Sequence, residues 1–254
     1  MTELFPAPAV TLLAALRLLP VAIVSPFLGG PLVPPLVRVA LAAGFGLIGA
    51  SLATPGGVAP EGLALAAAAA RELSLGTVLA LLAAAPVEAA RAAGRLADTF
   101  RGATLAELHV APIRQRESAT GDLLAQWVVV LAAWAGGDRL VVAGLVGSFG
   151  AIPPGGTFAL DAAREVALRA AGEVIACAVA VGAPVAAGVL AADLALAVVS
   201  RVAPQLGAVN TAQPARAALG LLAVAAAASA GAARLVALAA LAGAAPGALG
   251  GGRG

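Results

Sequence analysis

The sequence predicts an all-α fold: a polytopic helical membrane protein with broken helices and helical hairpins. Of its 254 residues, 61% are hydrophobic and only 11% are charged, against roughly 45–50% and about 25% in soluble domains. The mean hydropathy is +1.01. Several apolar runs reach about 20 residues, the length that an α-helix needs to cross a bilayer. We expect residues 1–254 to form a single domain.

Six apolar segments follow one another, over residues 8–30, 36–53, 62–86, 123–149, 171–199 and 217–245. In the first segment and directly after it, five prolines fall within sixteen residues, at Pro20, Pro26, Pro31, Pro34 and Pro35. Proline removes a backbone donor and resists regular helix, and irregular backbone at membrane depth has to be buried in protein or line a cavity. We therefore expect partner proteins to cover this region.

The fourth segment is interrupted by the residues GGDR at 136–139. The pieces on either side hold about 13 and 11 residues, and at 1.5 Å per residue neither is long enough to span a bilayer alone. This pattern predicts a helical hairpin or a broken helix.

The most polar part of the chain, residues 87–122, separates the third and fourth segments. In its first half Glu88, Arg91, Arg95 and Asp98 are three or four residues apart, which places them on one face of an amphipathic helix. The second half forms a long polar loop in this prediction. A solvated cytoplasmic connection is an equally simple interpretation of the whole charge run.

The arginines predict an orientation in the membrane. Residues 87–122 and 200–216 lie on the same side if every segment crosses, and together they hold seven arginines, against two in the connections on the other side. By the positive-inside rule, the arginine-rich side is cytoplasmic and the N-terminus is periplasmic.

Several ionisable residues lie inside apolar segments, among them Arg17, Arg38, Glu72, Glu173 and Asp193. Such groups cost at least a few kcal/mol in hydrocarbon and normally face a bundle interior, a partner or a water-filled path. One interpretation is a transport or proton pathway. The favoured one is pairing between helices or subunits that fixes assembly.

Composition excludes several classes of function. The net charge is +2 and no basic stripe alternates with aromatic residues, so the sequence shows no sign of a nucleic-acid-binding surface. The single cysteine, Cys177, forms no intrachain disulfide, and no Cys/His cluster offers metal-ligand spacing. Glu3 and the absence of a basic residue before Arg17 do not fit a cleaved signal peptide, so we expect the first segment to be retained.

Near the C-terminus, residues 192–222 read ADLALAVVSRVAPQLGAVNTAQPARAALGLL. An acidic residue in a helix is followed by an arginine, the pair PQ, a short irregular run, and a proline with a basic residue. These positions are Asp193, Arg201, Pro204, Gln205, Pro214 and Arg216. Their order resembles a hallmark of the type III export-gate family, the T subunit of injectisomes and the R subunit of the flagellar exporter.

The resemblance extends over nearly the whole chain. It includes an opening pattern at Arg17, Pro26, Pro34 and Arg38, and an acidic third helix with Glu72 and Gly76. It also includes a glycine–aspartate–glycine run at Gly94, Asp98 and Gly102, and the broken fourth segment. The residues FLGG with Pro34 and Arg38 favour the injectisome branch. The run PQLGAVN lacks the aromatic residue that the flagellar branch often has after PQ, and the flagellar assignment stays open.

The resemblance implies a protein that is not an enzyme and holds no cofactor. One copy of such a subunit joins several copies of two other small hydrophobic subunits in the bacterial inner membrane. Together they form a helical export gate at the entrance of the secretion channel, which unfolded proteins pass. The resemblance further implies that the assembly carries much of the chain out of the bilayer plane, unlike a simple six-span topology.

The resemblance also implies that residues 102–121 reach into the channel as a plug. The candidate plug residues are Gly102, Glu107, His109, Pro112, Arg114, Arg116 and Glu117. Because few apolar contacts would hold a polar loop in place, we expect deletion of residues 106–118 to leak ions or small solutes while assembly stays intact.

A second set of residues is assigned to assembly or ion pairing: Arg17, Arg38, Glu72, Asp193, Arg201, Pro204, Gln205 and Arg216. Asp193 and Arg201 share a helix face but lie about 12 Å apart along it, so each is expected to find a partner elsewhere. We expect Asp193→Ala to disrupt co-purification with the partner subunits.

Two other functions are weighed against the export gate. A secondary transporter would use the carboxylates of Glu72, Glu173 and Asp193, but transporters usually have two halves with corresponding broken helices, and this chain does not. A membrane-embedded hydrolase would use Ser148 and His109, but the residues GLVGSFG lack the G-x-S-x-G elbow and no orienting carboxylate stands out.

Overall fold

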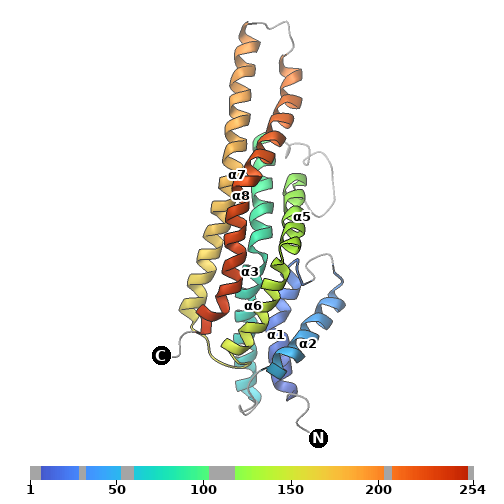
Figure 1. Cartoon of the computed structure of the whole chain (residues 1–254), viewed down its shortest axis with the longest axis vertical. Coiled ribbons are helices and arrows are strands. Elements are labelled where there is room, and N and C mark those ends of the chain that lie inside the picture. Colours follow the sequence, from blue (N-terminus) through green and yellow to red (C-terminus); the bar gives the residue numbers. More distant parts are fainter. Residues whose placement is uncertain (1–6, 29–32, 53–59, 103–117, 203–207, 251–254) are drawn as a thin grey trace. The chain divides into compact units, whose positions relative to one another are not determined.

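The computed structural model describes residues 7–28, 33–52, 60–102, 118–202 and 208–250, and the regular structure in these ranges is helical. Figure 1 shows the helices in chain order. They are α1 (Pro8–Val24), α2 (Pro35–Leu52), α3 (Gly62–Arg101), α5 (Ala119–Trp134), α6 (Gly137–Ala151), α7 (Leu160–Val202) and α8 (Ala208–Gly250). The predicted all-α fold is confirmed.

Helix length and composition agree with a polytopic membrane protein. Among the described residues, α2, α3 and α7 are long and apolar enough to cross a membrane. Two bent helix pairs raise the number to as many as five spans: α5 with α6, and Ala217–Ala227 with Gly231–Ala240 inside α8. Helix α1 has 17 residues and is short for a span of about 20.

The interruption of the fourth apolar segment is a broken helix. Helices α5 and α6 meet at an angle of 77°, and Gly136 between them adopts the left-handed conformation with φ of +78°. Glycine reaches this region without steric cost. Only two residues lie outside helix, because Asp138 and Arg139 already belong to α6, where an acidic residue in the first turn is favourable to the helix dipole.

Several helices extend beyond the apolar segments of the sequence. The third helix does not end at Pro86 but continues to Arg101, so the polar face of residues 88–98 belongs to α3. The irregular run between the last two segments is also shorter than expected, because α7 reaches Val202 and α8 already begins at Ala208. Proline costs an interior helix one hydrogen bond, and at Pro86 the buried residues before and after it offset that cost.

The chain forms two compact units that interleave along the sequence. Unit 1 comprises Met1–Pro86, Val129–Ala171 and Leu238–Gly254. Its core joins buried side chains from α1, α2, α3 and α6, among them Leu18, Ala42, Leu75, Leu79 and Phe149.

Unit 2 comprises Val87–Val128 and Gly172–Ala237. Small and β-branched side chains from α3, α7 and α8 form its buried clusters, which contain Ala93, Ala178, Val181 and Ala227, and Ala97, Val185, Val189 and Val224. Alanine and valine at these positions allow the helices to approach closely.

Candidate functional site

Unit 1 contains a buried ion pair between Arg17 of α1 and Glu72 of α3. Both Glu72 carboxylate oxygens accept from the guanidinium, at 2.6 Å from Nε and 3.0 Å from Nη2. The side chains are 0% and 2% exposed. A planar guanidinium matches a carboxylate in this two-point geometry, which is stronger than a single contact.

Neighbouring groups satisfy the remaining donors and acceptors of this pair. Arg17 Nη1 donates to the Ser148 carbonyl at 2.9 Å, and its guanidinium carbon lies 4.6 Å from the centre of the Phe149 ring. The Gly155 amide donates to Glu72 Oε1 at 2.7 Å. We refer to Arg17, Glu72, Ser148, Phe149 and Gly155 as the Arg17 cluster, which connects α1, α3, α6 and the turn after α6.

Helix α1 lies very close to α3 beside the Arg17 cluster. A Cβ at Gly76, one turn after Glu72, would lie 2.1 Å from the Arg17 carbonyl oxygen, well inside van der Waals contact. The residues Glu72 and Gly76 therefore act together: the carboxylate binds Arg17, and the glycine lets α1 approach.

Unit 2 contains a second buried carboxylate, Asp98 of α3, which is 2% exposed. It accepts hydrogen bonds from the Ser118 hydroxyl, the Thr120 amide (3.1 Å), the Thr120 hydroxyl (2.7 Å) and Arg101 Nη2. We refer to Asp98, Arg101, Ser118 and Thr120 as the Asp98 cluster. It joins the end of α3 to the start of α5.

Helices α3 and α5 also lie close together at Gly94, one turn before Asp98. A Cβ at Gly94 would lie 2.4 Å from the backbone of Gly121. One turn beyond Asp98, Gly102 ends α3 with a φ of +71°, a left-handed conformation that commonly ends helices. Gly94, Asp98 and Gly102 thus have separate tasks: close approach, hydrogen bonding and helix termination.

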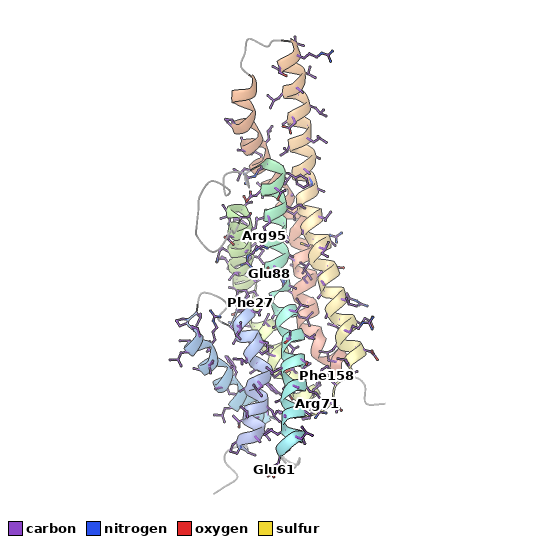
Figure 2. The ribbon with its side chains drawn as sticks, turned by 180° about the vertical axis from the view of Figure 1, so that it is seen from behind. Phe27, Glu61, Arg71, Glu88, Arg95 and Phe158 are labelled. Carbon is purple, nitrogen blue, oxygen red and sulfur yellow. The ribbon has the colours of Figure 1, made fainter. Side chains whose placement is uncertain are left out.

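The positions of Glu88 and Arg95 along α3 can be followed in Figure 2. Arg91, between them, forms an ion pair with Glu88, and its Nε lies 3.6 Å from a carboxylate oxygen of Asp122 in α5. Arg95 is exposed. The predicted polar face of this segment is thus divided between contacts to α5 and an exposed arginine.

Most candidate plug residues lie outside the described residues: Glu107, His109, Pro112, Arg114, Arg116 and Glu117. The structure describes Gly102 just before them and Ser118 just after them. The Asp98 cluster therefore joins the two described ends that border residues 103–117.

Three of the other candidate assembly residues lie in the described ranges: Arg38, Asp193 and Arg201. Arg38 Nε donates to the Val33 carbonyl at 2.7 Å, before α2. On α7, Asp193 is half-buried and Arg201 is exposed. Pro204 and Gln205 lie outside the described residues, as does the side chain of Arg216.

Other polar side chains suggested by the sequence have structural partners. Glu173 lies 3.9 Å from Arg234 of α8, and both are partly exposed. Ser148 is 1% exposed, and its hydroxyl donates to the Leu145 carbonyl at 2.6 Å, so it is not placed to attack a substrate. Within the described ranges, no group of three His, Cys, Asp or Glu side chains could hold a metal ion.

Sequence reasoning missed Ser118 and Thr120. The Ser118 hydroxyl accepts from the Gly121 amide at 2.9 Å, the bond that an N-cap serine makes three residues into a helix. A serine directly before an apolar helical segment was the available signal.

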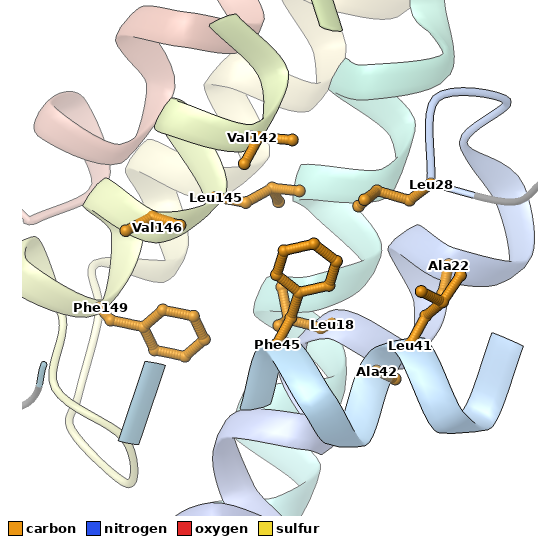
Figure 3. A pocket seen from close by; sticks show the side chains of 10 residues that line it. All are labelled: Leu18, Ala22, Leu28, Leu41, Ala42, Phe45, Val142, Leu145, Val146 and Phe149. Atoms are coloured by element: carbon orange, nitrogen blue, oxygen red, sulfur yellow. The ribbon is translucent and has the colours of Figure 1, made fainter. Parts of the chain in front are cut away.

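An apolar pocket lies in unit 1 beside the Arg17 cluster, with an empty volume of about 370 Å³ that includes its open side. Figure 3 shows its lining from three segments: α1 and the turn after it, α2, and α6. Leu18 and Phe149 line this pocket, and Phe149 also contacts Arg17. The lining side chains are apolar, so the pocket offers no group for catalysis.

The comparison with protein families agrees with the motifs placed above. A search of curated proteins found no match. The family model described as "Bacterial export proteins, family 1" matches residues 9–240, a range that includes both the Arg17 cluster and the Asp98 cluster. The chain therefore belongs to this family of bacterial export proteins, and it is a membrane-embedded structural subunit of the type III secretion and flagellar export apparatus.

Proposed function

We propose that this chain is the single-copy subunit of a type III export gate in the bacterial inner membrane. In this proposal it joins two other small hydrophobic subunits at the entrance of the channel for unfolded proteins. The observation that carries the proposal is the family match over residues 9–240. The injectisome branch is favoured over the flagellar branch by the residues FLGG with Pro34 and Arg38.

The test of this assignment is co-purification. Affinity-tagged chain, expressed with the two hydrophobic subunits encoded beside it, is expected to elute with both in a complex that contains one copy of this chain. A chain that purifies alone and monodisperse in a bilayer would contradict the assignment. Neighbouring genes decide the branch, since needle and secretin components indicate an injectisome and hook and rod components a flagellum.

Within this assembly we assign residues 103–117 to a plug of the channel. The segment is polar, with Arg114, Arg116 and Glu117 at its end, and such a segment suits a wet pore better than hydrocarbon. Deletion of residues 104–116 is expected to raise the ion conductance of the assembled gate in planar bilayers. This deletion keeps Ser118, which belongs to the Asp98 cluster and which a deletion of residues 106–118 would remove.

The conductance experiment needs an assembled complex as its starting point. The deletion variant is compared with the complete chain after both have been shown to co-purify equally with the partners. Equal conductance of the two assembled complexes would contradict the plug assignment while leaving the subunit assignment intact.

A secondary transporter is the alternative, and the Arg17 cluster weighs against it. Glu72 is bound at two points by Arg17 and also accepts from Gly155, so a transported cation would have to displace a guanidinium. Proton- or sodium-coupled uptake by the chain alone in liposomes would favour the transporter. Absence of uptake is the result expected of an export subunit.

A further inference from the structure

We propose that Asp98 is a positioning residue that holds the end of α3 against the start of α5, and so fixes the separation of the two ends that border residues 103–117. The inference goes beyond the proposed function, because it assigns a task to side chains outside the plug. Only its consequence for channel leakage rests on that function.

The Asp98 carboxylate caps α5 from another helix. The first amides of a helix have no partner inside it, and Asp98 accepts from one of them, that of Thr120. Ser118 accepts from the next, that of Gly121. The start of α5 is thus satisfied partly by its own N-cap serine and partly by a carboxylate twenty-two residues earlier in the sequence.

The hydroxyls of the Asp98 cluster can be oriented in one consistent way. Ser118 donates to Asp98 and accepts from the Gly121 amide. Thr120 donates to Asp98 and accepts from Arg101 Nη2 at 2.7 Å. The carboxylate accepts at both oxygens, which uses its capacity of about four acceptor sites. A neutral amide in place of Asp98 would turn one acceptor into a donor that faces other donors.

Helix α8 supports the same arrangement through Arg101. A Cβ at Gly220 would lie 2.1 Å from Cδ of Arg101, so the arginine stem passes directly over this glycine. The Arg101 side chain is 10% exposed and forms an ion pair with Asp98. The guanidinium is thus held from one side by α8 while it binds Asp98 and Thr120.

Together with the contact of Gly94 and Gly121, these bonds make the ends of α3 and α5 one rigid piece. Separating the two helices would break the three hydrogen bonds that Ser118 and Thr120 donate to Asp98 and leave the buried carboxylate with only Arg101 of its own helix, which is costly. The Asp98 cluster therefore holds the end of α3 and the start of α5 at a fixed separation.

The experiment measures the helix separation in the assembled gate. Spin labels are attached at Arg95→Cys on α3 and Leu123→Cys on α5, two exposed positions of unit 2, in a Cys177→Ala background. The variants are Asp98→Asn and Thr120→Val. Thr99→Ala is the matched control, because the Thr99 hydroxyl is exposed and its bond within the described part of the chain goes to the backbone of Arg95 in its own helix.

Both variants are expected to broaden the distribution of label distances and lengthen its mean, and the control to leave it unchanged. Unchanged distances in Asp98→Asn and Thr120→Val would overturn the proposal. Thr120→Val keeps the carboxylate and the shape of the side chain, so it decides the matter if Asp98→Asn fails to assemble.

Conductance of the same complexes separates this inference from the plug assignment. With both correct, Asp98→Asn conducts ions at a level between the complete chain and the deletion of residues 104–116. If the deletion leaks and Asp98→Asn neither leaks nor changes the distances, Asp98 has no positioning role and the plug remains. If the deletion does not leak, the plug assignment fails, and the label distances alone decide the role of Asp98.

Discussion

Arg17 and Glu72 show how a membrane-embedded subunit carries charge without exposing it. An isolated buried charge is expensive, but each charged group here faces its partner, and the Ser148 carbonyl and the Gly155 amide also bind the pair. Removing one member of a buried pair leaves the other uncompensated, whereas replacing both by apolar side chains of similar volume is often tolerated.

We therefore expect Arg17→Met or Glu72→Leu alone to lower the stability of the assembled subunit by about 3–5 kcal/mol. The double variant is expected to be more stable than either single variant, since no unpaired charge remains. Thermal unfolding of the purified gate, followed by the loss of this subunit, measures the order of the three.

The control for this comparison is Arg169→Ala, which removes an exposed ion pair with Glu165 in which both side chains are more than half exposed. Such surface pairs contribute little, so no change is expected. If Arg17→Met and Arg169→Ala lowered the stability equally, the buried pair would contribute no more to stability than the exposed one.

At the scale of helices, Gly76 of α3 allows α1 to come into close contact with α3. The Cβ of an alanine at Gly76 would collide with the backbone of Arg17, and α1 cannot move away without stretching the ion pair to Glu72. We expect Gly76→Ala to destabilise unit 1 by roughly 1–3 kcal/mol, as overpacking does. The yield and thermal stability of the co-purified subunit measure this effect.

Gly44→Ala in α2 provides the matched control. A Cβ at Gly44 would meet nothing within 4 Å, and alanine favours helix over glycine by about 1 kcal/mol. The control is expected to be neutral or slightly stabilising. Destabilisation by both changes alike would argue that glycine at Gly76 acts through backbone flexibility and not through helix contact.

Helix lengths connect the elements to the whole molecule. Helices α3, α7 and α8 have 40, 43 and 43 residues, or roughly 60 Å and more at 1.5 Å per residue, about twice the hydrocarbon thickness of a bilayer. These helices extend beyond the hydrocarbon core unless they are steeply tilted. The proposed export gate accommodates this length, because in that proposal part of the chain lies outside the bilayer plane.

The orientation of α3 can be tested with two exposed positions, Glu61 at its start and Arg95 near its end. In a Cys177→Ala background, a membrane-impermeant thiol reagent added to intact spheroplasts is expected to label Glu61→Cys. It is expected to label Arg95→Cys only after permeabilisation, because the positive-inside rule places the arginine-rich end in the cytoplasm. Labelling of both from outside would contradict this orientation.

At the scale of the whole molecule, substitution of Asp193 tests assembly with the partner subunits. This half-buried acidic residue lies in α7 among exposed apolar side chains such as Leu190 and Leu194, a surface that suits partner helices. We expect Asp193→Ala to reduce co-purification with the partner subunits severalfold, and Asp161→Ala, exposed on the same helix, to have no effect. Normal assembly with lost secretion in Asp193→Ala would favour a role in transport.

The sequence predicted the parts of this architecture that depend on neighbouring residues. The residues GGDR at 136–139 predicted the break between α5 and α6, and the order of motifs singled out Gly94, Asp98 and Gly102. At Pro86 the apolar segment ends but the helix does not, because α3 continues to Arg101. Burial on both sides of Pro86 sustains α3, and such burial depends on helices distant in the sequence.

Hydrophobicity and motif order by themselves determined that this chain is a helical membrane protein of an export apparatus. The tertiary structure alone decided which charges meet. Arg17 and Glu72 are 55 residues apart, and Asp98 and Ser118 are 20 apart on different helices. Side-chain periodicity gives the face of a helix on which a charge lies, but the identity of its partner depends on which helices cross and how closely glycine lets them approach.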